Sequence, residues 1–212
     1  ASRIAMLRQC SLFDEPPAGL GMGPFVRPPR LAIVPGRVHS VFYALVPSGA
    51  DAIRLHAHAR RGEEGLGFAG KATDAHRLHV TLHALGAHAV EPPESEVDRW
   101  CRAAAAVRQA PFDIVFDRVC TFGGKDNAWV FTSSDDAALL ALHEALGIAL
   151  ANTGERVVRQ RIAPHMTMSW RGRRIPEAAI EPVRWRAADL VLIDSHHGEG
   201  EHQVLGRWAL SG

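Results

Sequence analysis

Two short segments, one in each half of the chain, share a pattern that restricts what the chain can fold into. Residues 78–82 read LHVTL and residues 164–168 read PHMTM. Both place a histidine and a threonine two residues apart among apolar residues, which is the alternation of a half-buried β-strand. Because residues i and i+2 of a strand point to one face, each segment is predicted to present one imidazole and one hydroxyl on a face that is not the core.

Chance does not account for the two matching segments. The chain has 12 histidines in 212 residues, and 47% of its residues are hydrophobic. At these frequencies about 0.2 segments of the form His-apolar-Ser/Thr-apolar are expected, whereas two occur, 86 residues apart. The residues His79, Thr81, His165 and Thr167 are therefore interpreted as one functional feature.

The rest of the chain predicts short strands mixed with helices, which is an α+β fold rather than a doubly wound parallel sheet. Strands are expected at residues 39–47, 78–85, 113–119, 128–132, 161–170, 189–194 and 203–210. Helices are expected at residues 50–61, 94–109 and 134–152. Residues 1–37 contain six prolines and are expected to form an irregular N-terminal extension, while residues 38–212 are expected to form the folded domain.

Charge and cysteine content exclude several classes of protein. The formal net charge of +1 argues against a general polyanion binder, although residues 156–186 hold eight arginines against two acidic residues. The three cysteines form no CxxC pair, so neither a disulfide framework nor a thiolate zinc site is expected, and the predicted location is the cytoplasm. The sequence shows no bilayer-spanning apolar run, no signal-peptide pattern and no glycine-rich phosphate loop.

The paired segments suit acid–base chemistry at a phosphodiester. One imidazole can accept a proton while the other donates one, because the ordinary pKa of histidine lies near 6.5. Two threonine hydroxyls can hold the non-bridging oxygens of a phosphate. In-line displacement at such a site needs neither a metal nor a cofactor, and none is predicted.

These motifs resemble those of the 2H phosphoesterases, which are named for two HxTx motifs, and in particular the 2′-5′ RNA ligase-like RNA 2′,3′-cyclic phosphodiesterases. The resemblance covers about residues 37–212 and includes the segments VFYALVP, LHVTLHALG, DNAWVF, APHMTMSW and VLGRWAL. It implies two pseudo-symmetric lobes whose antiparallel sheets line a central cleft, with helices outside. It also implies metal-independent hydrolysis of RNA 2′,3′-cyclic phosphate ends to 2′-phosphate, and a weak, reversible 2′-5′ joining of RNA ends.

The same resemblance assigns roles to the motif residues. It makes His165 the base that activates water and His79 the acid for the leaving oxygen, with Thr81 and Thr167 on the phosphate. Family members often carry an arginine five residues after the second histidine, where this chain has a tryptophan. The next residue, Arg171, is the candidate phosphate clamp, because strand parity places it on the His165 face.

Further side chains are candidates for the cleft. His83 shares the predicted face of His79, four residues further along the strand. Aromatic residues that can stack on bases are Phe42, Tyr43, Phe122 and Trp129.

The other histidines do not predict a metal site. His56 and His58 diverge on a predicted helix. His196, His197 and His202 show no recognisable tetrahedral spacing and are expected in a surface loop.

Two other functions stay open from the sequence. The same chemistry on a small cyclic nucleotide is favoured by the near-neutral net charge, whereas the arginine-rich stretch favours longer RNA. A non-catalytic module that binds nucleotides or RNA ends would use the same cleft, but binding alone does not require two proton-transfer groups. In each case the expected partner is a nucleotide or an RNA end, and neither a membrane nor a protein partner is predicted.

Overall fold

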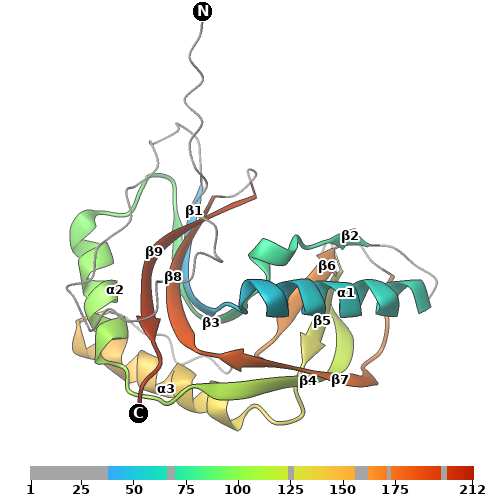
Figure 1. The fold of residues 1–212 in the computed structure, drawn as a ribbon. Coiled ribbons are helices and arrows are strands. Elements are labelled where there is room, and N and C mark those ends of the chain that lie inside the picture. Colours follow the sequence, from blue (N-terminus) through green and yellow to red (C-terminus); the bar gives the residue numbers. More distant parts are fainter. Residues whose placement is uncertain (1–37, 66–69, 124–126, 156–161, 171–172, 197–199) are drawn as a thin grey trace, which may run out of the picture.

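Over the described residues the protein has the expected α+β fold, in which three helices pack on one antiparallel sheet (Figure 1). The structure is a computed structural model that describes residues 38–65, 70–123, 127–155, 162–170, 173–196 and 200–212. The helices are α1 (Gly49–Gly65), α2 (Glu94–Ala106) and α3 (Ala137–Asn152), and a 3₁₀ turn, η1, spans Ala75–Arg77. The strands are β1 (His39–Leu45), β2 (Lys71–Ala72), β3 (Val80–His88), β4 (Phe112–Phe122), β5 (Ala128–Thr132), β6 (Met166–Trp170), β7 (Ala178–Ala187), β8 (Asp189–His196) and β9 (Glu201–Ala209). The extension expected at residues 1–37 lies outside the described residues.

The strands form one sheet with the order β7-β4-β5-β6-β3-β1-β8-β9, and the short β2 pairs with β6. Every strand pair in the described part of the chain is antiparallel. β3 and β6 meet at the centre through one residue pair, Val80 with Met166. The arm of β3, β1, β8 and β9 lies on the left of Figure 1 and the arm of β6, β5, β4 and β7 on the right. The two lobes implied by the resemblance are therefore two arms of a continuous sheet.

The two arms repeat the same series of elements. In one, β1 and α1 precede β3, and in the other, β5 and α3 precede β6. The repeat extends to the register of the ladders, because each motif strand bulges by one residue directly after its threonine, at Leu82 in β3 and at Met168 in β6. This shared bulge supports the pseudo-two-fold relation between the arms.

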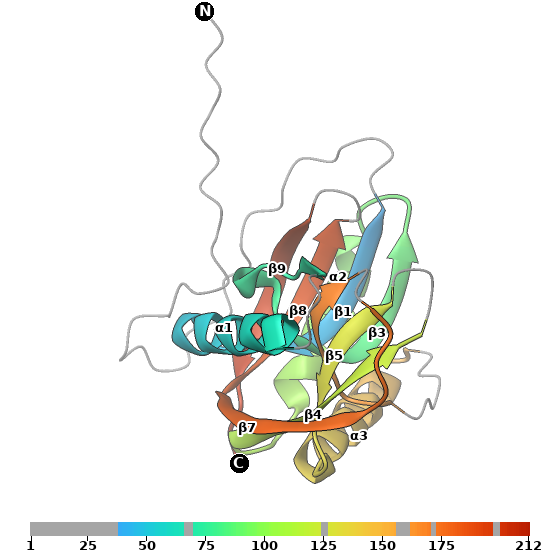
Figure 2. The same cartoon turned by 90° about the vertical axis from the view of Figure 1, so that its right-hand side faces the viewer.

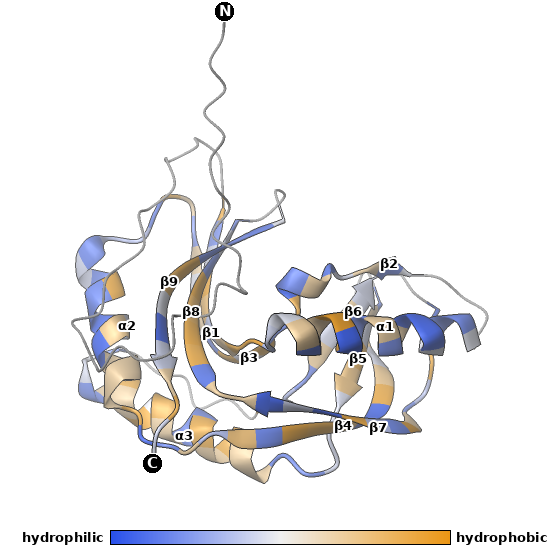
Figure 3. Cartoon of the chain, viewed as in Figure 1, coloured by the Kyte–Doolittle hydropathy of each residue, from blue (hydrophilic) through white to orange (hydrophobic). Residues whose placement is uncertain are grey.

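Each arm is covered by helices. α2 and α3 pack on each other and contact β9 and β3, whereas α1 contacts β7 (Figures 1 and 2). Because α1 follows β1 and α3 follows β5, each of these two helices crosses to the arm opposite its preceding strand. The middle of β8 is apolar and buried, at residues 190–193 (Figure 3). No described helix has the length and apolar character needed to cross a bilayer.

Helix ends differ from prediction by a few residues. Gly62 was expected to end α1 but lies inside it, where a Cβ would come within 3.1 Å of the Trp129 ring. The missing side chain thus permits close packing of α1 on β5. α3 begins after Asp136, because Ser134, expected as its N-cap, hydrogen-bonds the Asp117 carboxylate instead.

The strand β7 was not predicted, because its arginines obscure the alternation. Val183 and Trp185 are buried on one face, while Arg184 and Arg186 are exposed on the other. Both arginines form ion pairs with Asp113 on β4, at 3.5 and 3.2 Å. This pairing offsets part of the positive charge that the arginine-rich stretch was expected to offer to RNA.

The two motif strands begin later than predicted. β3 starts one residue after His79 and β6 one residue after His165, so both histidines precede a strand rather than lie inside it. The turn η1 ends just before the first motif, and Pro164, which lacks a backbone donor, comes just before the second. Each histidine is therefore the last residue of the segment that leads into its strand.

Tyr43 and Trp129 belong to the core, and the prediction that they line a cleft is wrong. Their relative exposures are 0% and 1%, so neither ring offers a face to a base. The Tyr43 hydroxyl donates to the Trp100 carbonyl oxygen at 2.6 Å, which ties β1 to α2. Burial raises the pKa of Tyr43 well above its ordinary range.

Tyr43→Phe should therefore destabilise the fold. The change leaves the buried Trp100 carbonyl without its donor, which typically costs about 1–3 kcal/mol. Urea unfolding monitored by circular dichroism measures this loss as a lower midpoint with an unchanged slope. An unchanged free energy of unfolding would contradict the buried hydrogen bond.

Candidate active site

His79 and His165 lie at the junction of the two arms. One residue pair joins β3 to β6 there, and in an antiparallel ladder the residues on either side of a pair face each other in reverse order. This direction brings His79 toward Thr167 and Thr81 toward His165. The four motif residues therefore gather around the pseudo-two-fold axis.

The two imidazoles are held in the same way. Nδ1 of His79 lies 2.7 Å from the Arg77 carbonyl oxygen, and Nδ1 of His165 lies 2.8 Å from the Ala163 carbonyl oxygen. A carbonyl oxygen can only accept, so Nδ1 carries the proton in both rings and Nε2 of the neutral ring keeps its lone pair. Neither Nε2 has a hydrogen-bond partner among the described residues. Both rings thus present a nitrogen that can accept or, once protonated, donate a proton.

An aromatic ring packs on each imidazole. Phe42 of β1 is stacked on His79, with ring centroids 5.0 Å apart. Phe122 of β4 lies against His165, with centroids 4.6 Å apart and planes tilted by 56°. The two predicted aromatic residues that reach the site therefore limit the rotation of the imidazoles.

The motif threonines are available as hydrogen-bond donors. Thr81 and Thr167 are half-buried and alternate with buried apolar residues. Within the described ranges, neither hydroxyl has a hydrogen-bond partner. Each can therefore donate to an oxygen placed between the two arms.

The electrostatics of the site act most clearly on His79. Burial of its ring lowers the pKa below the ordinary 6.5, and the nearby charges of Arg77 and His165 lower it further. The hydrogen bond to the Arg77 carbonyl opposes this shift. His79 is thus neutral at pH 7 in the free protein, and it lies close enough to His165 for the two to interact electrostatically.

A third histidine, His202, reaches this place and was not predicted there. Its ring is edge-on to His79 and Phe42, with centroid distances of 5.3 and 6.0 Å. Burial, followed by the charges of His79 and Arg77, lowers the pKa of His202 to about 3, so the ring is neutral at pH 7. Three consecutive polar residues begin β9, at 201–203, so no sequence signal marks its earlier start, and the approach of His202 to His79 depends on the arrangement of the sheet.

His83 does not line the site, and the prediction that it does is wrong. The bulge after Thr81 interrupts the strand alternation, so simple parity with His79 fails. His83 turns toward α3, where its Nε2 lies 2.8 Å from the carbonyl oxygen of His143. The two imidazoles are stacked with centroids 3.9 Å apart.

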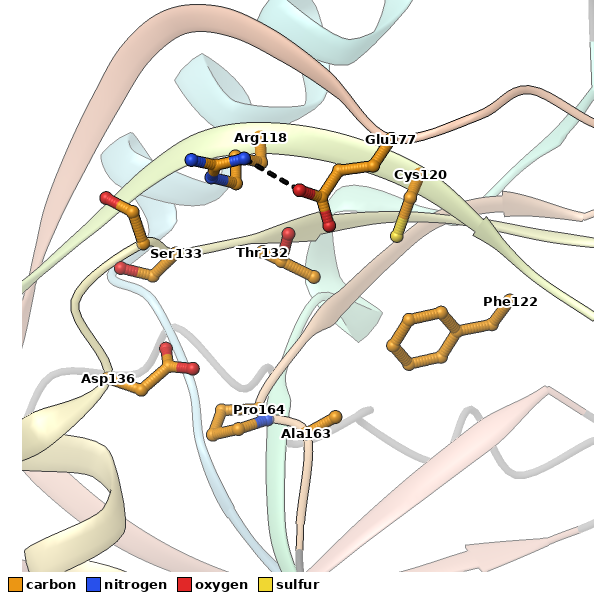
Figure 4. A pocket seen from close by; sticks show the side chains of 10 residues that line it. Arg118, Cys120, Phe122, Thr132, Ser133, Asp136, Ala163, Pro164 and Glu177 are labelled. Atoms are coloured by element: carbon orange, nitrogen blue, oxygen red, sulfur yellow. Dashed lines mark hydrogen bonds and ion pairs between the residues drawn. The ribbon is translucent and has the colours of Figure 1, made fainter.

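A pocket of about 390 Å³ borders the second motif (Figure 4). Figure 4 shows Cys120 and Phe122 of β4 pointing toward Ala163 and Pro164, which directly precede His165. The rest of its lining is polar or charged: Arg118, Thr132, Ser133, Ser134, Asp136 and Glu177. Arg118 and Glu177 are paired at 2.7 Å, and burial followed by the charge of Glu177 raises the pKa of the Cys120 thiol. The pocket is thus an amphipathic space beside a motif histidine.

The sequence also made predictions for Arg171 and His196. Arg171 lies outside the described residues, so nothing is said of its position relative to the motifs. His196 was expected in a surface loop, but it is buried at the end of β8.

Comparisons with known proteins agree with the fold. The model of the 2′-5′ RNA ligase superfamily matches residues 46–199. LigT of Escherichia coli in its apo form is 21% identical, with a TM-score of 0.62 over 83% of this chain and 99% of LigT. TT0787 of Thermus thermophilus is 22% identical, with a TM-score of 0.61 over 82% of this chain and 98% of that protein. No curated protein matches.

At these identities the solved structures show a common fold and no more. The family match carries the assignment, because it spans well over half of the chain and includes both histidine–threonine motifs. The chain therefore belongs to the 2′-5′ RNA ligase superfamily of 2H phosphoesterases.

Proposed function

We propose that the protein hydrolyses 2′,3′-cyclic phosphate ends of RNA to 2′-phosphates without a metal ion. The observation that carries the proposal is the pair of motif histidines, which meet at the junction of the arms with the same Nδ1–H tautomer. Each is accompanied by a threonine hydroxyl with no partner among the described residues. A site built only to bind phosphate has no need of two matched proton-transfer groups.

The reaction follows from these groups. The neutral Nε2 of His165 takes a proton from water, whose oxygen attacks the phosphorus. The bond from phosphorus to O3′ breaks, protonated His79 gives its Nε2 proton to O3′, and the phosphate stays on O2′. Thr81 and Thr167 donate to the non-bridging oxygens while charge builds on them. A 5′-hydroxyl in place of water would give a 2′-5′ linkage by the same transfers, and the reverse reaction would exchange the roles of the histidines.

The acid role of His79 requires a change on substrate binding. In the free protein its pKa is lowered, which favours the neutral form. The negative charge of a bound phosphate acts in the opposite direction. The substrate itself would thus help to protonate the acid.

Binding of the RNA end would extend from the junction toward the pocket beside His165. Phe122 contacts this histidine and also lines the pocket. LigT of Escherichia coli has been solved with 3′-AMP, and we extend nucleotide binding to this chain. Arg171 is the proposed phosphate clamp on the grounds of its place in the sequence.

Removal of either motif histidine should lower turnover strongly. His79→Ala and His165→Ala should each reduce kcat by about 10²–10⁴, and the double variant should lose far less than the product, because the two residues act as a unit. Thr81→Val and Thr167→Val should cost less, since each removes one donor. The assay is hydrolysis of an oligoribonucleotide 2′,3′-cyclic phosphate in EDTA, with identification of the phosphate position in the product.

The control for this series is His56→Ala on α1, which should keep wild-type turnover. A cyclic mononucleotide assayed in parallel decides between RNA and small nucleotides as the substrate class. Near-wild-type activity of either single histidine variant would contradict the catalytic assignment. Binding of the oligonucleotide without turnover would instead support a non-catalytic module.

The titration of His79 should shift upward when an anion binds. In the free protein its imidazole should titrate below 6.5, because burial disfavours the charged form, and saturating inorganic phosphate should raise this pKa. Proton–nitrogen NMR of the imidazoles, with the His79→Ala spectrum for assignment, measures both values. An ordinary or raised pKa in the free protein, or no response to phosphate, would contradict the described environment.

A further inference from the structure

A second cluster of ionisable side chains lies away from the motif histidines, at the end of β1 and β8. It consists of His39, Asp194 and His196, whose relative exposures are 4%, 1% and 2%. His39 and His196 are directly paired across the two strands, and Asp194 precedes His196 by two residues, so all three share a face. One ligand atom from each residue lies within 4.8 Å of the others.

The distances converge on one carboxylate oxygen. Oδ2 of Asp194 lies 2.6 Å from Nδ1 of His39 and 3.3 Å from Nε2 of His196. The two rings are nearly perpendicular, with centroids 5.0 Å apart. In a tetrahedral site with bonds near 2.1 Å, ligand atoms stand about 3.4 Å apart. The cluster therefore approaches the spacing of a metal site, in which the short contact between Asp194 and His39 would have to open.

The buried carboxylate of Asp194 lacks a permanently cationic side chain to balance its charge among the described residues. The carboxylate is buried, and no arginine or lysine in the described part of the chain pairs with it. Its Oδ1 and the Nε2 of His39 are both buried without a hydrogen-bond partner. A buried, incompletely bonded carboxylate is costly unless a positive charge lies beside it.

We propose that His39, Asp194 and His196 bind a first-row transition-metal dication, with Zn²⁺ as the best match. Two imidazoles and one carboxylate form a donor set that suits Zn²⁺ and its neighbours rather than Mg²⁺ or Ca²⁺. Donor-type residues continue along the same row of the sheet, because His88 pairs with His39 and Glu201 pairs with His196. The ion would replace the proton held between His39 and Asp194.

This site is structural and separate from the proposed phosphate site. His39 lies on the β1 face that carries the core residues Val41 and Tyr43, whereas Phe42 points to the other face, where it stacks on His79. A metal held by the cluster would fasten β1 to β8 behind the motif residues. It therefore does not take part in the proposed hydrolysis.

The test measures metal binding by the purified full-length protein after EDTA treatment and removal of the chelator. Calorimetric titration with Zn²⁺ should give one equivalent per chain, and Co²⁺ should give the visible absorption bands of a low-coordinate nitrogen–oxygen site. Saturating Zn²⁺ at about 100 times Kd should raise Tm by roughly 5–10 °C. Asp194→Asn and His39→Ala should each weaken Zn²⁺ binding by more than about 100-fold, since loss of even an outer-shell partner costs about 10–100-fold.

His56→Ala serves as the control and should bind Zn²⁺ as the wild type does. Wild-type protein that takes up no stoichiometric Zn²⁺ and shows no rise in Tm would overturn the proposal and leave a purely hydrogen-bonded cluster. Undiminished binding by Asp194→Asn and His39→Ala would also overturn it, because the ion would then lie elsewhere. The wild-type measurement decides the matter even if a variant fails to fold.

Discussion

The contact of β3 with β6 is the interaction on which the arrangement of the site depends. It consists of one apolar pair, Val80 with Met166, buried at the point where two four-stranded arms join. Because the pairing is antiparallel, it sets the two motifs in opposite directions about one point. A parallel contact or a shift of one residue would separate the histidines or turn one of them into the core.

The local backbone then fixes the orientation of the motif side chains. Each histidine stands one residue before its strand and donates Nδ1–H to the carbonyl two residues earlier, which fixes the tautomer. Each threonine is followed by a bulge, which ends the strand alternation and turns the next residues away from the site. The bulge therefore limits each motif to the three residues from the histidine to the threonine, because the strand alternation ends there.

Local patterns predicted most of the elements and the four motif residues. Alternation over three consecutive residues was enough to single out His79, Thr81, His165 and Thr167, and the contact of β3 with β6 brings the four together. It failed for His83 because a bulge has no clear signature in a single sequence. Tyr43 and Phe42 were both predicted to line the cleft. Adjacent residues of a strand point to opposite faces, so strand alternation permits only one of the two to do so.

Other features depended on long-range geometry. β7 was missed because arginines that pair with Asp113 give it the composition of a solvated loop. The approach of His202 to His79 and the meeting of His39 with Asp194 both require the order of strands in the sheet. The order of the strands depends on which apolar faces pack together across the whole chain. It cannot be predicted from the spacing of residues within one segment.

In the proposed reaction the two motif histidines work as one acid and one base on a cyclic phosphate. The most direct measurement is the pH dependence of kcat/KM for an oligoribonucleotide 2′,3′-cyclic phosphate between about pH 5 and 9. Because the reaction requires opposite protonation states of the two histidines at the same moment, we expect a bell-shaped profile whose two limbs belong to the coupled pair. A profile that stays flat, or that rises to a plateau with a single limb, would contradict it.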